Sequence, residues 1–548
     1  MDNSKNSLQN IIKNVQTQNY TEAEQLCILE LKSNPNNQPI LTLLGTIYYN
    51  NHEFIKSIEY FEKALKLKYS ENIIKLLGNA YYYIGNYEKA YPFLKDTLNF
   101  KREINTLKKL THIAVVTRVN MNDAYKFGLE IEEKSPFDLE NLSYLGELCL
   151  NLGQFEKSLY YANKILAINP KFAKGLILKG IIEEVIFSDD KTAQKYFKKA
   201  IRYGEIAEGY YNLSINYSHS DRKKSNQYAK YLIKNNLSNR TNELNNIIGS
   251  NYFALKQLKR GIAYFEKSWD DIEKPFKNFW DMQPHQDKTC YLHLTKGFGD
   301  QIMFIRYLPL LAKNFKSIKI PCSQNVLQLF KHSFSELNNV EFFEYKDLFT
   351  DYDYSTSIFF LPYHLKMDFN DIPYSSGYLK CDTQKINEYK TKYFDTNKTK
   401  IGICWEAGGA ILRTDLKRSI PLCEFKDLIE ILTKNGNRIY SVQKNANEIN
   451  SKSFRDLNIT DIGSHCKTFY DTASALKNLD YLITVDTSVA HLAGALGIKT
   501  ILILPYFSDW RWFDSSNHTD WYKSITIIRL SAQTNKRNEL INIQSMID

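Results

Sequence analysis

The segment Asp486-Thr487-Ser488-Val489-Ala490-His491 follows an apolar run and precedes a stretch rich in small residues. This pattern predicts a strand that ends near Asp486 and a helix that begins near Ser488. The unpaired N–H groups and the dipole at a helix start form a ready anion site, and the hydroxyls of Thr487 and Ser488 could donate to the same ligand. The segment is therefore a candidate phosphate site. A capped helix with a packed histidine at 491 is the structural alternative.

A basic loop follows the predicted strand at 400–405. Lys417, Arg418 and Ser419 stand in it, and the fork of an arginine side chain binds phosphate through two parallel hydrogen bonds. The loop is thus a second candidate phosphate contact. The alternative is an ordinary solvated pair of charges.

A glycine-rich turn, Gly297-Phe298-Gly299-Asp300, follows the predicted strand at 289–295. Gly297 and Gly299 would let a substrate approach the backbone closely, and Asp300 stands at the expected start of a helix. A carboxylate at such a position can take a proton from a substrate hydroxyl. It can also simply cap the helix.

Other polar and aromatic groups give weaker signals. Asp351-Tyr352-Asp353 matches an Asp-x-Asp metal motif but stands outside the context that the motif needs. The 8 cysteines form no Cys-x-x-Cys pair and the 10 histidines show no metal-ligand spacing, which indicates free thiols in a reducing compartment rather than a zinc site. The cluster Asp509-Trp510-Arg511-Trp512, with Trp521, could stack a base or a sugar, and core packing explains it equally well.

Strand-like and helical segments alternate through the second half of the chain. This alternation predicts parallel sheets with helices on both faces, in two successive series that enclose a cleft. A helix is expected over about 301–314, and the charged stretch 382–400 between the series is expected to be weakly structured. The predicted strands are 289–295, 317–321, 340–345, 357–361, 400–405, 438–443, 480–486 and 500–504.

The first half of the chain repeats with a period close to 34 residues. Leu44-Gly45-x-x-Tyr48 is echoed by Leu77-Gly78-x-x-Tyr81, by Leu145-Gly146 and by Ile248-Gly249-x-x-Tyr252. This pattern resembles the tetratricopeptide (TPR) family, whose helix–turn–helix units stack into a solenoid with a concave binding surface. Seven or eight units fit between about residues 5 and 270. Small residues recur where paired helices must approach, at Ala23, Ser57, Ala90, Ala124, Ser158, Ala193 and Gly261, and larger ones follow four positions later, including Phe61, Leu94, Phe197 and Phe265.

The net charge of +10 is unevenly distributed. Residues 151–250 hold 16 Lys and Arg against 9 Asp and Glu, a local excess of 7 positive charges. A solvated helical face or a surface for an acidic partner would both produce this excess, and no nucleic-acid motif accompanies it. No uncharged apolar run long enough for a membrane span occurs, and the first ten residues show no secretory signal, so a cytoplasmic protein is expected.

Five segments of the second half occur in the order typical of a known enzyme superfamily. They are GFGDQIMFIRYLPLLA, IGICW, KRSIPL, YLITVDTSVAHLAGALG and LPYFSDWRWF with Trp521-Tyr522, within residues 285–530. Together they resemble the TPR-linked branch of the heptosyltransferase superfamily, which is similar to glycosyltransferase family 9. The resemblance implies a GT-B fold of two Rossmann-like lobes and an inverting, metal-independent transfer from a nucleotide sugar, with no cofactor.

The resemblance also implies domain limits and residue roles. It divides the chain into a TPR array at 1–274, an acceptor-side lobe at 275–385 and a donor-side lobe at 386–548. It makes Asp300 the catalytic base within the Gly297 and Gly299 loop. The implied donor-binding residues are Lys417, Arg418, Glu448, Asp486, Thr487, Ser488 and His491, with Glu448 near the ribose.

We therefore expect a bacterial protein glycosyltransferase whose repeats hold a polypeptide acceptor, such as flagellin or a surface protein. Two alternatives stay open at this point. The enzyme could act on a surface or lipid-linked glycan, or the chain could be a non-catalytic TPR scaffold with a degenerate transferase domain. The retained set of Asp300, Arg418, Asp486 and His491 argues against a degenerate domain.

Overall fold

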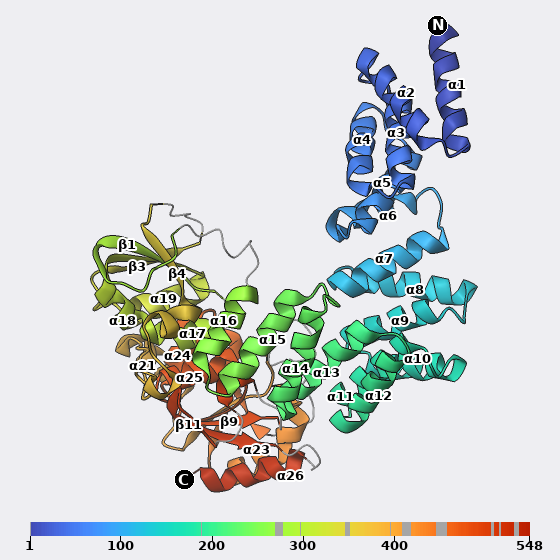
Figure 1. Cartoon of the computed structure of the whole chain (residues 1–548). Helices are drawn as coiled ribbons and strands as arrows, with labels where there is room; N and C mark the ends of the chain where they lie inside the picture. Colours follow the sequence, from blue (N-terminus) through green and yellow to red (C-terminus); the bar gives the residue numbers. More distant parts are fainter. Residues whose placement is uncertain are drawn as a thin grey trace. The chain divides into compact units, whose positions relative to one another are not determined.

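The computed structural model describes residues 2–187, 189–268, 278–295, 297–345, 351–394, 396–407, 418–444, 457–505, 509–513, 517–530 and 536–547. The chain forms two compact units (Figure 1). One comprises Met1–Ile186 and Arg202–Glu205, and the other comprises Phe187–Ile201 and Ile206–Asp548. The expected domain limits at 274 and 385 stay predictions, and residues 269–277 lie outside the described residues.

The first unit is built from paired repeat helices, the blue to blue-green segment of Figure 1. Consecutive helices pack against each other, most closely as the pairs α3–α4, α5–α6 and α9–α10. The helices are α1 (Asp2–Gln16), α2 (Tyr20–Ser33), α3 (Gln38–Asn50), α4 (Phe54–Leu67), α5 (Glu71–Tyr83), α6 (Tyr87–Thr97), α7 (Ile104–Thr117), α8 (Met121–Lys134), α9 (Leu139–Asn151), α10 (Phe155–Ile168) and α11 (Ala173–Val185).

Glycine in one helix and a large side chain in its partner explain the close pairing. A Cβ added at Gly45 in α3 would stand 2.7 Å from the ring of Phe61 in α4, and one at Gly78 in α5 would stand 3.2 Å from Cδ2 of Leu94 in α6. Phe61 and Leu94 are completely buried. The glycines of the Leu-Gly pattern and the large positions of the 34-residue period are therefore contact points between paired helices. The predicted repeat array is confirmed, with sixteen helices before the first strand in the described residues.

The second unit begins with five more repeat helices and continues into two parallel sheets. Gly249 and Phe265 repeat the pairing seen at Gly45 and Phe61, since a Cβ at Gly249 would stand 2.8 Å from the Phe265 ring. The helices are α12 (Asp190–Arg202), whose last residue is counted with the first unit, α13 (Ile206–Ser220), α14 (Arg222–Lys234), α15 (Thr241–Ala254) and α16 (Leu258–Ser268).

The first sheet has four parallel strands in the order β3-β2-β1-β4. Three of its strands lie where the sequence predicts them. The fourth does not, because β4 ends at Ser357, whose hydroxyl caps the following turn by accepting from the Phe359 N–H. The elements are β1 (His285–His293), α17 (Phe298–Phe304), α18 (Leu308–Leu311), β2 (Phe315–Cys322), α19 (Gln324–Ser333), β3 (Val340–Glu344), β4 (Tyr354–Ser357) and α20 (Leu361–His364).

Two expectations on helices are wrong. The helix expected over 301–314 is divided into α17, α18 and two short 3-10 turns, with Pro309 in the first turn of α18. The stretch expected to be weakly structured contains α21 (Thr383–Tyr393), which Asp382 caps by accepting from the N–H groups of Gln384 and Lys385.

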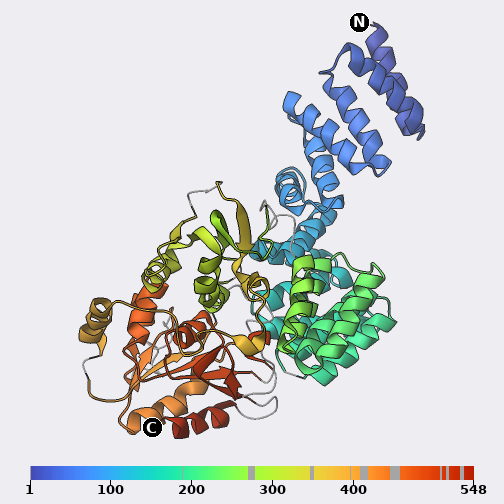
Figure 2. The same cartoon turned by 60° about the vertical axis from the view of Figure 1, so that its left-hand side comes forward.

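The second sheet has seven strands in the order β10-β11-β9-β8-β5-β6-β7, and only the β10–β11 pair is antiparallel. Helices α23 and α26 cover one face, and α24 and α25 cover the other (Figure 2). The elements are β5 (Lys400–Cys404), α23 (Lys426–Lys434), β6 (Arg438–Ser441), β7 (Thr460–Asp461), α24 (Phe469–Leu476), β8 (Tyr481–Val485), α25 (Ser488–Ala495), β9 (Thr500–Leu504), β10 (His518–Thr519), β11 (Tyr522–Arg529) and α26 (Lys536–Ile541). The predicted strands at 400–405, 438–443, 480–486 and 500–504 are confirmed, whereas β7, β10 and β11 were not predicted.

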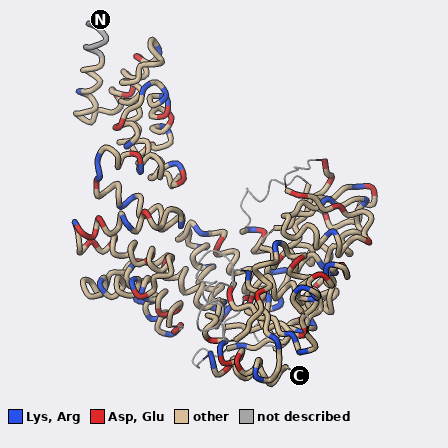
Figure 3. Tube along the Cα trace, turned by 180° about the vertical axis from the view of Figure 1, so that it is seen from behind, with Lys and Arg blue, Asp and Glu red and all other residues tan. Residues whose placement is uncertain are grey.

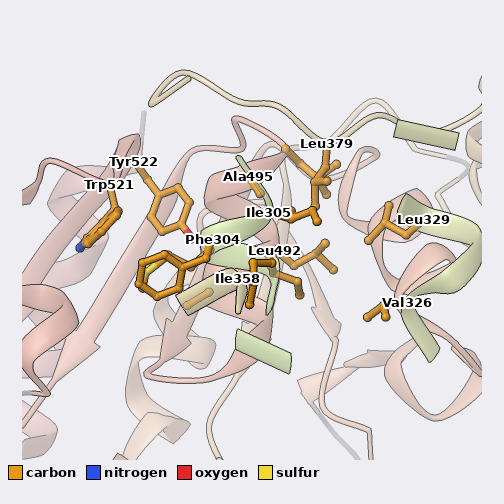
Figure 4. Packing of buried hydrophobic residues seen from close by; sticks show 14 of the residues in the cluster. Phe304, Ile305, Val326, Leu329, Ile358, Leu379, Leu492, Ala495, Trp521 and Tyr522 are labelled. Carbon is orange, nitrogen blue, oxygen red and sulfur yellow. The ribbon is translucent and has the colours of Figure 1, made fainter. Parts of the chain in front are cut away.

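One hydrophobic core joins the layers of both sheets, because α17 packs directly on α25. The side chains that meet there come from elements far apart in the sequence (Figure 4): Phe304, Ile305, Ile358, Leu492, Ala495 and Tyr522. The α/β character and the parallel sheets of the second half are confirmed. This shared core fixes the end of β1 beside the start of α25.

Candidate functional site

A cavity of about 750 Å³ opens at the carboxyl ends of strands from both sheets. In the second sheet the chain order reverses between β5 and β8, and the cavity lies at the ends of these two strands and of β6. Ligands of doubly wound sheets bind at this kind of reversal. The first sheet contributes the turn after β1, with Gly297 and Asp300, and Asn325 at the start of α19. The cavity is therefore lined from two parallel sheets.

Two helices of the second sheet begin at this cavity. Thr487 caps α25, its hydroxyl accepting from the Val489 N–H, and both Thr487 and Ser488 line the cavity. Thr468 caps α24 in a capping box with Asp471, and Lys467 and Thr468 also line the cavity. Two positive helix ends thus point at one volume, which suits a ligand with more than one negative group.

The ends of β5 and β6 are joined by the side chain of Gln443. Its amide oxygen accepts from the Glu406 N–H at 3.1 Å and from the Cys404 thiol at 3.3 Å. Gly463 packs on the same strand end, where an added Cβ would stand 2.3 Å from the Gln443 carbonyl oxygen. These contacts hold the backbone at Glu406 in the cavity wall.

Arg418 and Asp486 face each other at the end of β8. The Arg418 Nη1 lies 3.8 Å from Oδ2 of Asp486, and the Asp486 side chain is almost completely buried. Burial, together with the nearby Asp509 carboxylate, raises the pKa of Asp486, and Arg418 opposes this shift. Arg418 keeps part of its side chain exposed, so it can contact Asp486 and a ligand in the cavity.

Asp300 is held by an arginine from the opposite sheet. Arg511, in the 3-10 turn η9 (Trp510–Trp512), donates from Nε and Nη2 to Oδ1 of Asp300 at 2.9 and 2.5 Å. Its Nη1 donates to Oδ1 of Asp509 at 2.6 Å. Burial raises the pKa of Asp509, but the charge of Arg511, its hydrogen bonds to the carboxylate and the charge of Arg418 together lower it by more, so the net shift is downward. Since both contacts to Asp300 fall on Oδ1, the Oδ2 oxygen is not occupied by Arg511.

His491 lines the cavity as a neutral side chain. Burial, with a contribution from Arg511, lowers the pKa of His491 to about 3. Its Nδ1 lies 3.1 Å from the Tyr522 hydroxyl, and its ring stacks on Trp512 with centroids 4.8 Å apart. Gly299 makes room for it, because a Cβ there would stand 2.9 Å from Cδ2 of the imidazole. Gly299 therefore allows the His491 ring to approach the backbone closely.

A fully buried arginine, Arg306, supports His491 through Tyr522. Arg306 is completely inaccessible to solvent, and its Nη1 donates to the Trp521 carbonyl at 2.7 Å. Its Nη2 donates to the Tyr378 hydroxyl at 3.2 Å, and its guanidinium lies 4.7 Å from the centre of the Tyr522 ring. Arg306 thus fixes Tyr522, the partner of His491.

The structure brings together six of the predicted donor-site and base residues in one cavity: Asp300, Arg418, Asp486, Thr487, Ser488 and His491. Gly297 and Gly299 line the same cavity. Lys417 and Glu448, the two other predicted donor contacts, lie outside the described residues.

Sequence reasoning missed several of the lining residues. The pairing of Arg511 with Asp300 was not predicted, although the alternation of charged and aromatic residues at 509–512 placed an arginine between two rings. Thr468 and Lys467 were also missed, and the spacing of Thr468 and Asp471 could have revealed them as the start of a helix. No sequence signal pointed to Gln443.

The Asp-x-Asp segment at 351–353 has a structural role. Asp353 accepts from the Thr289 N–H at 2.8 Å and pairs with Lys288 at 3.4 Å, so it ties β4 to β1. Among the described residues, no three His, Cys, Asp or Glu side chains are grouped as ligands of one metal ion. No described helix is both long and apolar enough to cross a membrane.

A family model of the tetratricopeptide repeat matches residues 39–71, which cover α3 and α4. No curated protein matches the chain. Three solved structures are similar to the chain. YrrB, titled a TPR protein with an unusual peptide-binding site, is 16% identical over 33% of this chain and 95% of its own, with a TM-score of 0.28. Yeast Tom70 is 13% identical over 46% of this chain and 55% of its own (TM-score 0.34), and a tetratricopeptide repeat protein from Parabacteroides merdae is 16% identical over 50% of this chain and 97% of its own (TM-score 0.28). The family match at residues 39–71 shows that the N-terminal helical array contains TPR repeats. Repeats of this type form surfaces for protein–protein interaction.

Proposed function

We propose that this chain is a glycosyltransferase that moves a sugar from a nucleotide-sugar donor to an acceptor, with inversion at the anomeric carbon. One observation carries the proposal: a single cavity combines two helix starts and Arg418 on the second sheet with the carboxylate of Asp300 on the first. A nucleotide sugar needs the first set for its phosphates, and its acceptor needs the second. The two sheets would be the two lobes of a GT-B fold.

The donor phosphates would bind where the positive groups converge. The starts of α24 and α25 supply N–H groups and hydroxyls, and Arg418 supplies a guanidinium. Lys467 adds a further charge at the rim. In this proposal protein groups, rather than a metal ion, balance the charge on the departing diphosphate.

Asp300 would act as the base. The acceptor oxygen attacks the anomeric carbon from the face opposite the phosphate, and its proton passes to Asp300 Oδ2. The bond between the anomeric carbon and the phosphate oxygen breaks, and its electron pair leaves with the nucleoside diphosphate. Neutral His491 can contact the sugar or the phosphate without adding a charge.

We further propose that the acceptor is a polypeptide held by the repeats and that the protein is cytoplasmic. The helical array offers a protein-binding surface, whereas the first sheet has four strands in the described residues with which to select a large acceptor. All eight cysteines are free thiols, as expected in a reducing compartment.

Thermal unfolding with a panel of nucleoside diphosphates, with and without EDTA, tests the donor site. A hundredfold excess of ligand over Kd stabilises the folded state by about 2.7 kcal/mol. We expect stabilisation that survives EDTA and that shrinks in Arg418→Gln. Arg438→Gln is the matched control, because Arg438 is an exposed arginine at the opposite end of β6.

A chain that no nucleotide stabilises would contradict the proposal, and stabilisation lost on chelation would contradict its metal-free form. Intact-mass analysis of candidate acceptor proteins, with and without the active chain, then tests the acceptor class. A mass increase of one sugar residue on a protein supports a polypeptide acceptor.

A further inference from the structure

The last repeat pair, α15 and α16, shares its core with the candidate active site. Phe253 at the end of α15 is only 1% exposed, because it packs on two sides. Within the repeat pair its ring lies 5.0 Å from that of Phe265 in α16 between ring centres, and the other side faces the α/β part of the unit. Its ring lies 4.9 Å from Trp510, 5.7 Å from Phe359 and 5.7 Å from Phe369 between ring centres. All three partners belong to the α/β part of the second unit.

The equivalent position of an earlier repeat behaves differently. Tyr49 follows Tyr48 of the repeat pattern as Phe253 follows Tyr252. Tyr49 packs against Phe54 of the next helix, at 5.4 Å between ring centres, and so stays within the repeats. The last repeat therefore uses this position for a contact that the repeat pattern itself does not require.

Three consecutive residues of η9 connect Phe253 to the cavity. Trp510 is buried against Phe253, Arg511 lines the cavity and pairs with Asp300, and Trp512 stacks on His491. The Arg511 guanidinium lies 4.5 Å from the centre of the Trp510 ring. The aromatic ring that supports Arg511 on one side thus rests on a repeat helix on the other.

A second contact holds the same part of the chain to α15. Lys256, two residues after the end of the helix, forms an ion pair with Asp520, and its ammonium lies 4.7 Å from the centre of the Phe513 ring. Phe253 and Lys256 therefore contact the chain before β10, at Trp510 and Phe513, and after it, at Asp520.

We propose that Phe253 is a positioning residue for Arg511, so that the last repeat is a working part of the active site and not only a platform for the acceptor. Phe253 fixes Trp510, Trp510 fixes the plane of the Arg511 guanidinium, and Arg511 orients the Asp300 carboxylate. The catalytic consequence rests on the proposed transferase function. The positioning itself is a property of the fold.

Phe253→Leu in the full chain tests the proposal, with Phe61→Leu as the matched control. Phe61 is an equally buried phenylalanine of a repeat helix whose partner, Gly45, lies within the repeats.

Two readouts are expected to respond to Phe253→Leu alone. Amide hydrogen exchange at residues 509–513 should speed up, because the support of η9 is weakened. The kcat for sugar transfer should fall by about 10-fold or more, since small misplacement of a catalytic group is costly, while the KM for the nucleotide sugar stays within about 2-fold. Phe61→Leu should change neither readout.

Unchanged exchange at 509–513 in Phe253→Leu would overturn the proposal, and so would an equal response in Phe61→Leu. Faster exchange with unaltered kcat would overturn the catalytic part. If the wild-type chain binds no nucleotide and transfers no sugar, the proposed function fails, and the exchange comparison still decides whether Phe253 positions η9.

Discussion

At the scale of single residues, the candidate site depends on a carboxylate whose two oxygens differ. Arg511 makes both of its contacts to Asp300 through Oδ1, and Asp300 is itself buried at the cavity wall. A carboxylate held at one oxygen keeps a fixed direction while the other oxygen can receive a proton. This arrangement can serve a base, whereas a helix cap alone would not need an arginine from the opposite sheet.

Asp300→Asn separates chemistry from binding. The amide keeps the size of the side chain and removes the proton acceptor, so transfer should fall by about 10²-fold or more. Nucleotide affinity should stay near the wild-type value, because the proposed phosphate contacts lie on the second sheet. Initial rates and isothermal titration with the nucleotide measure the two effects. Transfer at the wild-type rate would show that the base is another residue.

At the scale of elements, a repeated glycine sets the distance between paired repeat helices. Gly45 and Gly249 each face a buried phenylalanine ring in the partner helix, at the same place in the period. Alanine in a helix interior is favoured over glycine by about 1 kcal/mol, so propensity alone would select alanine here. Close packing against the phenylalanine ring therefore outweighs the difference in helix propensity and selects glycine.

Gly45→Ala should therefore destabilise the first unit despite its better helix propensity. The added Cβ would stand 2.7 Å from the Phe61 ring, and overpacking of this kind costs about 1 to 3 kcal/mol. In the double variant with Phe61→Leu, the alanine should cost less than it does alone. Urea denaturation of the four chains gives the coupling energy, and purely additive effects would contradict the packing explanation.

At the scale of the whole molecule, buried neutral histidines make folding sensitive to acid. Burial lowers the pKa of His293 to about 3 and that of His364 to about 4. His491 is buried in the same way. Each of these side chains titrates near 6.5 in the unfolded chain, which therefore binds protons before the folded chain does as the pH falls. Stability should decrease on acidification below about pH 6.5.

His364→Gln should reduce this pH dependence. The histidine Nδ1 lies 2.9 Å from the Thr356 hydroxyl, a contact that an amide can keep. Each such histidine costs up to about 1.4 kcal/mol per pH unit between the two pKa values, so the variant should lose less stability from pH 6.5 to pH 4.5. Denaturation midpoints across this range measure it. The same change at exposed His52 is the control and should leave the slope unaltered.

Figure 3 marks the Lys and Arg residues in blue along the described chain. Among residues 151–250, α12 has four exposed lysines: Lys191, Lys195, Lys198 and Lys199. Lys195→Glu with Lys198→Glu should weaken transfer to an acidic protein acceptor, because long-range attraction is lost. Hydrolysis of the donor by water should not change. Lys63→Glu with Lys66→Glu is the matched pair, with the same spacing on another second helix of a repeat. An equal loss in both pairs, or a loss of donor hydrolysis, would contradict acceptor binding at α12.

The sequence by itself determined the local structure of this protein. The repeat helices, the strands β5, β8 and β9 and the junction at Asp486-Thr487 could be read from periodicity and capping residues, since these act over a few neighbours. Gly497 is a further local signal: it adopts φ +72° just after α25, and a glycine in this left-handed conformation is the usual end of a helix.

Only the tertiary structure decided which side chains meet. Arg511 and Asp300 are separated by 211 residues, and nothing in either segment specifies the other. The strand β11 completes the core beside His491 and was not predicted. It pairs with β9, and a pairing between segments that are separated in the sequence leaves no local signal. Phe253 stands next to the repeat position Tyr252 in the sequence, and only the packing of α15 on η9 brings its ring against Trp510. Contacts of this kind are determined by how the layers stack around a common core, and a linear pattern of residue types contains no distances between layers.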